Sequence, residues 1–194
     1  NVADITEVIT ATTDCDGDGV LDVTEIANGT DPQNECDYNV ADITVAITAT
    51  TDCDGDGVLD VTEVANGTDP TDDCDYNVAD ITVAITSIGD CDGDGVTNAQ
   101  ESIDGTDSND PCDFVLANQT MPASAAWNTL DCDGDGIDNQ TELAGGNDPL
   151  DPCSPLQAPD YNGYNPLNLI WSSADCDGDG DLNGTEDTNG SDPY

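Results

Sequence analysis

The chain has 194 residues, of which 44 are Asp or Glu and none is Lys, Arg or His, so its formal charge is −44. This charge excludes nucleic-acid binding and attraction to anionic membranes, because both depend on basic side chains. Val, Ile, Leu and Phe make up about 18% of the residues, too few for folding by apolar burial alone. We expect a chain that is not an enzyme, inserts into no membrane and needs another source of stability.

The chain is a tandem array. An Asp-Cys-Asp-Gly-Asp-Gly motif recurs in steps of 38, 38, 41 and 44 residues, a period that indicates a repeat protein. The motif starts at Asp14, Asp52, Asp90, Asp131 and Asp175. We divide the chain into repeats 1 to 5, which span 1–36, 37–74, 75–112, 113–153 and 154–194. The fifth is expected to be truncated, because its second cysteine would fall beyond Tyr194.

Each motif opens a twelve-residue acidic loop. In loop 1, Asp14 to Glu25, acids stand at positions 1, 3, 5, 9 and 12 and glycine at position 6, as in EF-hand calcium loops. Position 7 contributes a backbone carbonyl. The ligands are hard oxygens, which favours Ca²⁺ over Zn²⁺ or Cu²⁺, and they are more numerous than Mg²⁺ usually takes from protein. The predicted calcium ligands are Asp14, Asp16, Asp18, Val20, Asp22, Glu25, Asp52, Asp54, Asp56, Val58, Asp60, Glu63, Asp90, Asp92, Asp94, Val96, Asn98, Glu101, Asp131, Asp133, Asp135, Ile137, Asn139, Glu142, Asp175, Asp177, Asp179, Asp181, Asn183 and Glu186.

A short helix is expected after each loop. The segment from Asp22 to Asn28 has room for one or two turns, and Gly29 suits a left-handed helix end. Five Ca²⁺ ions would neutralise less than a quarter of the charge, so the next aspartate is a candidate ligand for a second ion. Alternatively, it caps the next turn or forms an Asx turn before proline. The second-site candidates are Asp31, Asp69, Asp107, Asp148 and Asp192.

The nine cysteines alternate between two spacings. Within a repeat the separation is always 21 residues, whereas between neighbouring repeats it is 17, 17, 20 or 23. The constant spacing favours pairing within each repeat, and bridges between neighbouring repeats are the alternative. The predicted disulfides are Cys15–Cys36, Cys53–Cys74, Cys91–Cys112 and Cys132–Cys153, with Cys176 left for a partner beyond Tyr194. Paired cysteines in a chain with so small a core indicate an oxidising, extracellular compartment.

Six Asn-X-Ser/Thr triplets are candidate N-glycosylation sites. Asn139 and Asn183 also occupy loop position 9, where a role as ligand would compete with glycosylation. The better acceptors are Asn28, Asn66, Asn118 and Asn189.

The connectors between repeats show period-two alternation. In residues 39–51, Ile43, Val45 and Ile47 alternate with polar or small residues, which predicts a half-buried strand. A lone strand must pair with another repeat or another chain. The expected fold class is therefore an elongated, mostly irregular tandem repeat without a large hydrophobic core. In it, EF-hand-like calcium loops with short helical turns are joined by short β-strand connectors.

The loop motif followed by Asn-Gly-Thr-Asp-Pro resembles thrombospondin type 3 repeats, most closely those of large secreted surface proteins of Bacteroidetes. The resemblance covers all five repeats and implies structural Ca²⁺ on the loop acids, often with two ions per repeat. Ser108 and Asp181 depart from the pattern without removing a side-chain ligand.

These observations together predict a calcium-stabilised, disulfide-linked extracellular or cell-surface protein that forms a stalk or filament. Its expected partners are copies of itself or cell-surface proteins. The alternative is a calcium-dependent adhesion module that binds glycans or a partner surface protein.

Overall fold

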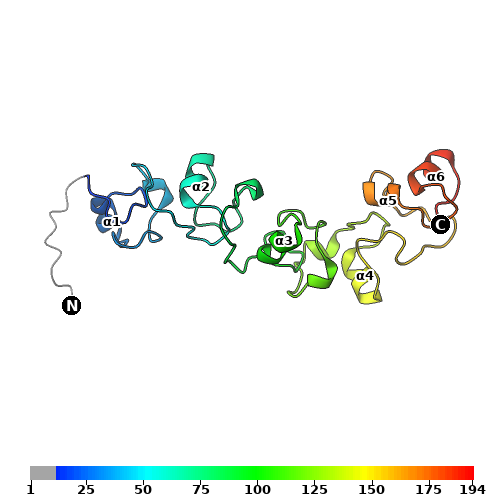
Figure 1. Cartoon of the computed structure of the whole chain (residues 1–194). Helices are drawn as coiled ribbons and strands as arrows, with labels where there is room; N and C mark the ends of the chain where they lie inside the picture. The colour runs from blue at the N-terminus through cyan, green and yellow to red at the C-terminus, as the bar shows by residue number, and fades with distance from the viewer. Residues whose placement is uncertain (1–11) are drawn as a thin grey trace. The chain divides into compact units, whose positions relative to one another are not determined.

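The structure is a computed structural model that describes residues 12–194; residues 1–11, which begin repeat 1, lie outside the described part. The described residues divide into two compact units, separated between Gly89 and Asp90. Within residues 12–194 each unit consists of short helices and irregular segments, and no strand is present (Figure 1). In the same range, no helix has the length and apolar character needed to cross a bilayer.

One seven-residue helix begins within each acidic loop and continues beyond it. The first unit holds α1 (Asp22–Asn28) and α2 (Asp60–Asn66), and the second holds α3 (Asn98–Asp104), α4 (Asn139–Gly145) and α6 (Asn183–Asn189). Each begins at loop position 9 and ends at a left-handed glycine; at Gly29, with φ of 89°, the N–H donates to the Glu25 carbonyl at 2.7 Å. The helix predicted over Asp22 to Asn28 and its glycine end are confirmed, because only a residue without Cβ takes this φ without strain.

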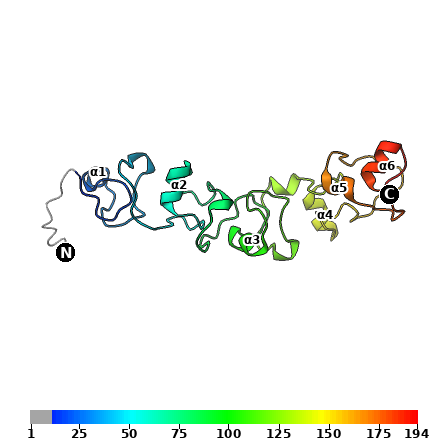
Figure 2. The same cartoon turned by 45° about the horizontal axis from the view of Figure 1, so that its top comes forward.

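Helix α5 (Leu169–Ser173) belongs to a longer connector of the second unit. It lies beside α6 in both views (Figures 1 and 2). The contact is close at Gly184, where an added Cβ would stand 2.9 Å from the Cβ of Ser172. The small residue in the first turn of α6 therefore allows the two helices to pack.

In residues 37–194 the connectors are not strands, which corrects the prediction from the alternating pattern of residues 39–51. After the 3₁₀ helix η1 (Val40–Asp42), the connector of repeat 2 runs back over loop 1. The N–H groups of Thr44 and Thr48 donate to the carbonyls of Gly19 and Gly17 at 2.9 and 2.8 Å, and the next residue shares each acceptor at 3.1 and 3.0 Å. The carbonyls of the loop glycines thus accept the connector N–H groups that a partner strand would otherwise accept.

The same arrangement recurs in the following repeats. After η2 (Val78–Asp80), Thr82 and Thr86 donate to Gly57 and Gly55, both at 2.8 Å. In the second unit, the segments after η3 (Leu116–Asn118) and before α5 reach loops 3 and 4, while η4 (Trp127–Thr129) precedes loop 4. The donor and acceptor pairs there are Thr120 to Gly95, Ser124 to Gly93 and Asn165 to Gly134.

We expect Gly55→Ala to be far more damaging than Gly67→Ala. Both glycines have positive φ, 83° and 85°, so both variants carry the strain of a left-handed non-glycine residue, about 1–2 kcal/mol. Only at Gly55 would the added Cβ lie 2.5 Å from Thr86 Oγ1 and 3.0 Å from Ser87 N; at Gly67 no atom lies within 4 Å. Denaturant titration in Ca²⁺ measures the difference. Equal losses of unfolding free energy in the two variants would show that the position of the connector does not depend on this contact.

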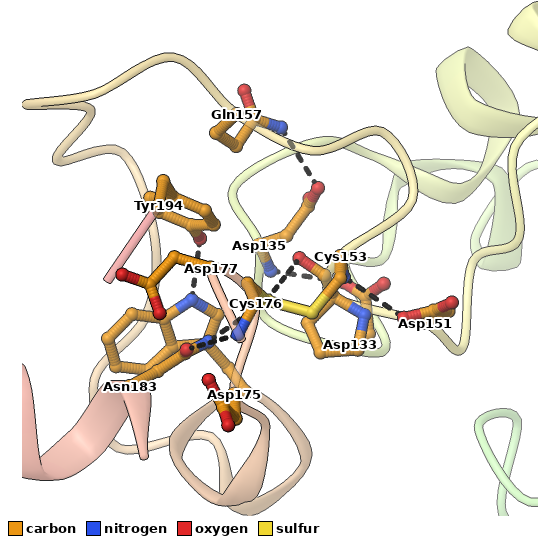
Figure 3. Close-up of a disulfide and its surroundings, with 12 residues drawn as sticks. Asp133, Asp135, Asp151, Cys153, Gln157, Asp175, Cys176, Asp177, Asn183 and Tyr194 are labelled. Carbon is orange, nitrogen blue, oxygen red and sulfur yellow. Dashed lines mark hydrogen bonds between the residues drawn. A yellow bond between two sulfur atoms is a disulfide. The ribbon is translucent and has the colours of Figure 1, made fainter. Parts of the chain in front are cut away.

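Disulfides join neighbouring repeats, so the predicted pairing within repeats is wrong. The described bonds are Cys36–Cys53, Cys112–Cys132 and Cys153–Cys176, and Cys74 and Cys91 are disulfide-bonded as well. The predicted pairs were Cys15–Cys36, Cys53–Cys74, Cys91–Cys112 and Cys132–Cys153. The constant 21-residue spacing reflects the fixed length of the loop, helix and turn. The second cysteine, at the end of this segment, is bonded to the cysteine at position 2 of the next loop. Figure 3 shows this junction at Cys153–Cys176.

Apolar side chains form small clusters instead of one core. In the second unit, Val96, Phe114 and Trp127 are buried together, and the Trp127 indole N–H donates to the Pro111 carbonyl at 2.8 Å. Helix residues such as Ile26 are exposed; that residue keeps 55% of its surface accessible. The helices therefore gain little from apolar burial, and their position depends on the loops before them.

Candidate metal centre

The backbone of each acidic loop is folded around its first aspartate. In loop 2 (Asp52–Glu63), the two carboxylate oxygens of Asp52 accept the N–H groups of Gly55 and Gly57 at 2.8 and 3.0 Å. Gly57 has φ of 95°, which permits the sharp turn at position 6. One oxygen from each of Asp52, Asp54 and Asp56 lies within 4.8 Å of the others. The fold thus gathers three acids around one point before the helix contributes a fourth.

The fourth acid is the glutamate at position 12, on the first turns of the helix. Glu63 is fully buried, and neither of its carboxylate oxygens has a hydrogen-bond partner. Asp54 Oδ2 and Asp56 Oδ2 are likewise buried without a partner. Buried polar atoms without partners are rare because their desolvation is not offset. A chain without any basic side chain has no internal cation to offset it.

The equivalent oxygens lack partners in loops 1 and 3, and fewer of them do so in loops 4 and 5. They are Asp16 Oδ2, Asp18 Oδ2 and both oxygens of Glu25 in loop 1; Asp92 Oδ2, Asp94 Oδ2 and both oxygens of Glu101 in loop 3; Asp133 Oδ2 and both oxygens of Glu142 in loop 4; and Glu186 Oε2 in loop 5. Several buried, unpaired carboxylate oxygens facing one loop are the donor set that fits Ca²⁺. Positions 3, 5 and 12 therefore carry the strongest structural support among the predicted ligands.

Position 9 connects two parts of the loop through hydrogen bonds. Asp60 Oδ1 accepts the Cys53 N–H at 2.9 Å, and Oδ2 accepts the hydroxyls of Thr51 and Tyr38 at 3.1 and 3.4 Å. The equivalent Asn98, Asn139 and Asn183 also accept the N–H of loop position 2 through Oδ1. This residue fastens the start of the loop to the start of the helix. Its coordination of an ion remains a prediction.

Burial raises the pKa values of the loop acids, and the neighbouring carboxylates raise them further. The pKa of Glu63 is raised to about 8 and that of Asp54 to about 7. In loop 4 the pKa of Glu142 is raised to about 9. With pKa values this high, proton binding by these carboxyl groups competes with cation binding near neutral pH.

Burial of the loops depends on the connectors that cover them. In loop 5 the acids Asp175, Asp177 and Asp179 are exposed, and no atom lies within 4 Å of a Cβ placed on Gly178 or Gly180. Loop 4 is instead covered by the segment before α5, from which Gln157 Nε2 donates to Asp135 Oδ2 at 3.1 Å (Figure 3). The connector therefore contributes to the desolvation of the loop aspartates, a role that the sequence pattern did not reveal, whereas Glu186 of loop 5 is buried without such a cover.

The second-site aspartates adopt the geometry of the alternative prediction. Asp31 Oδ1 accepts the N–H of Gln33 at 3.2 Å, which is an Asx turn. The four equivalent residues accept the N–H two positions on at 3.0 to 3.3 Å. Asp37 Oδ2 in turn accepts the Asp31 N–H at 3.1 Å. The turn is thus built from carboxylates that already accept hydrogen bonds, and a second ion in each repeat remains a prediction.

Comparison with known protein families identifies repeated segments that coincide with the loop, helix and turn. Four segments match the sequence model of the bacterial TSP3 repeat: residues 14–35, 52–73, 90–111 and 131–152. Each match begins at loop position 1 and ends one residue before the second cysteine, so it contains the loop, helix and Asx turn. The connectors and the loop at Asp175 lie outside the matched segments. No curated protein and no solved structure was found to match the chain.

Proposed function

From the four bacterial TSP3 repeats that this chain contains, we propose that it is a calcium-stabilised, disulfide-linked structural protein of the cell exterior that serves as a stalk or filament. The observation that carries the proposal is the recurrence of buried loop carboxylates without partners at the same three positions of loops 1 to 3. Calcium bound there would offset their desolvation and fix the short helices that follow. The repeats would then keep a regular shape without a large core.

The junctions between repeats support a load-bearing role. Within the first unit, repeats 1 and 2 are joined by Cys36–Cys53 and by the connector that lies over loop 1. A covalent bond and a metal loop at one junction restrict bending more than either alone. Disulfides of this kind persist in oxidising compartments, which supports placement outside the cell.

An adhesion role is the second candidate, and one feature of the second unit favours it. A shallow cavity of about 250 Å³ is lined by Asp160, Tyr161, Asn162, Tyr164 and Asp192, among others. Tyr164 also stacks on Trp171 with ring centroids 4.0 Å apart. Aromatic faces next to carboxylates and amides are suited to sugars or organic cations. A glycan array probed with the calcium-loaded protein would test this role.

Electron microscopy of the native protein in millimolar Ca²⁺ tests the structural role. We expect threads of uniform width with a regular axial spacing, and loss of that regularity after chelation. Threads longer than one chain would identify a filament, and threads of one chain length a stalk. Compact particles without axial regularity would contradict both forms of the proposal.

A further inference from the structure

An asparagine–aspartate pair joins the end of the helix to the following connector in repeats 1 to 3. In repeat 1, Asn28 at the end of α1 donates through Nδ2 to Asp42 Oδ2 at 2.6 Å. In repeat 3 the residue types are exchanged: Asn118 on the connector donates to Asp104 Oδ2 at the end of α3, also at 2.6 Å. The corresponding pair in repeat 2 is Asn66 to Asp80, at 2.8 Å. Each pair thus contains one asparagine, which is on the helix end in the first two pairs and on the connector in the third.

Both members of each pair are followed two residues later by threonine. The six triplets are Asn28-Gly-Thr30, Asp42-Ile-Thr44, Asn66-Gly-Thr68, Asp80-Ile-Thr82, Asp104-Gly-Thr106 and Asn118-Gln-Thr120. Whichever member is asparagine therefore lies in an Asn-X-Thr triplet. A hydrogen bond between asparagine and aspartate needs no hydroxyl two residues on, so the pair alone does not explain the threonines.

We infer that this pair is an N-glycan attachment site, occupied at Asn28, Asn66 and Asn118, with the aspartate orienting the acceptor amide. The modification is independent of the bound calcium on which the proposed function rests. In the reaction, a bond forms between Nδ2 and the anomeric carbon of a sugar supplied as a glycosyl diphosphate. The bond between that carbon and the phosphate oxygen breaks, the diphosphate leaves, and a base of the transferase takes one Nδ2 proton. The other amide N–H remains to donate to the aspartate.

The space around the site fits a bulky substituent. Asn28 and Asn66 are exposed, and Asn118 is half-buried. No atom lies within 4 Å of a Cβ placed on Gly29, Gly67 or Gly105, the glycines that follow the helix ends. Asn189 at the end of α6 is exposed in the same way.

Two other triplets fit badly. Asn139 and Asn183 are fully buried, and their Oδ1 atoms accept the N–H groups of Cys132 and Cys176 at 3.1 Å. The Asn139 amide also donates to the Trp127 carbonyl at 3.1 Å. A sugar on either residue would require the loop to open. The structure thus separates sequence triplets that are equivalent by motif alone.

Mass spectrometry of glycopeptides from the native protein tests the inference. We expect sugars on Asn28, Asn66 and Asn118 and unmodified peptides at Asn139 and Asn183. A native protein without sugar at the first three residues, or with sugar at Asn139 or Asn183, would overturn it.

Variants expressed in the source organism separate attachment from a purely structural pair. Asp104→Asn combined with Asn118→Asp keeps the hydrogen-bonded pair and should move the sugar to position 104. Thr30→Ala keeps the Asn28 pair and should remove the sugar from Asn28 alone. Calcium stoichiometry should remain unchanged in both, so a failure of the calcium proposal would be seen separately. A sugar that stays absent from position 104, or persists at Asn28 after Thr30→Ala, would contradict the inference.

Discussion

Removal of calcium at pH 8 should abolish most of the helical circular dichroism and expand the chain. The helices α1 to α4 and α6 have seven residues each, which is too short for stability in water without their loops. Without the ion, the loop acids of a chain with charge −44 repel one another. Circular dichroism and small-angle scattering before and after chelation measure both effects, with Mg²⁺ at equal ionic strength as the control.

Because the pKa values of the loop acids are raised, the effect of chelation should depend on pH. The pKa of Glu63 rises from its ordinary value of 4.5 to about 8 in the ion-free fold, so folding favours the protonated form. This contribution stabilises the ion-free fold below about pH 4.5 and is lost as the pH rises through 8. Chelation should therefore disrupt the chain less at pH 5 than at pH 8, while calcium affinity should rise with pH. An ion-free chain that keeps its dichroism at pH 8 would contradict metal dependence.

The acidic loop and helix were the most predictable parts of this fold. Their pattern is local: spacing places Glu25 one helical turn after Asp22, and Gly29 ends the helix by its own backbone preference. The Asx turn at Asp31 depends only on a neighbour two residues away, so it too follows from the local sequence. Sequence reasoning succeeded where a short segment determines its own geometry.

Contacts between segments were harder to predict. The alternation of Ile43, Val45 and Ile47 is compatible with a strand, but the acceptors for the connector were the carbonyls of Gly17 and Gly19. The loop glycines are also an indication of this contact, because a Cβ on Gly19 would lie only 3.0 Å from the side chains of Ile43 and Ile47. Glycine at position 6 is required both by its φ and by this contact. A motif match explains only the first requirement.

The disulfide pairing also depends on contacts between segments. Constant spacing identifies a rigid module, and bonds that join rigid modules span the variable segments between them. Cys36 and Cys53 are bonded across a 17-residue separation, whereas Cys153 and Cys176 are bonded across 23 residues. Position 2 of the loop places its cysteine next to the preceding repeat, as the 3.4 Å contact of Cys53 Sγ with the Glu35 carbonyl illustrates.

Glu63→Gln and Asp60→Asn should have very different effects on calcium binding, although each removes one negative charge from loop 2. Both Glu63 oxygens are buried without partners, so they are available to an ion. Glutamine would replace one of them with an amide donor. Loss of an outer-shell partner of a metal ligand lowers affinity by roughly 10–100-fold, and we expect loss of a direct carboxylate ligand to lower the affinity of this loop at least as much.

Asparagine at position 60 should be tolerated, because Asn98, Asn139 and Asn183 occupy the same position in loops 3 to 5. The amide oxygen of the Asp60→Asn variant would still accept the Cys53 N–H, and the hydroxyls of Thr51 and Tyr38 can rotate to accept from its amide nitrogen. Titration calorimetry at neutral pH measures the number of sites and their affinities. Equal losses for the two variants would show that position 9 binds the ion as directly as position 12. Loss of every site after Glu63→Gln would mean that the loops fold and bind as one unit, because a change in loop 2 would then reach loops with which it shares no ligand.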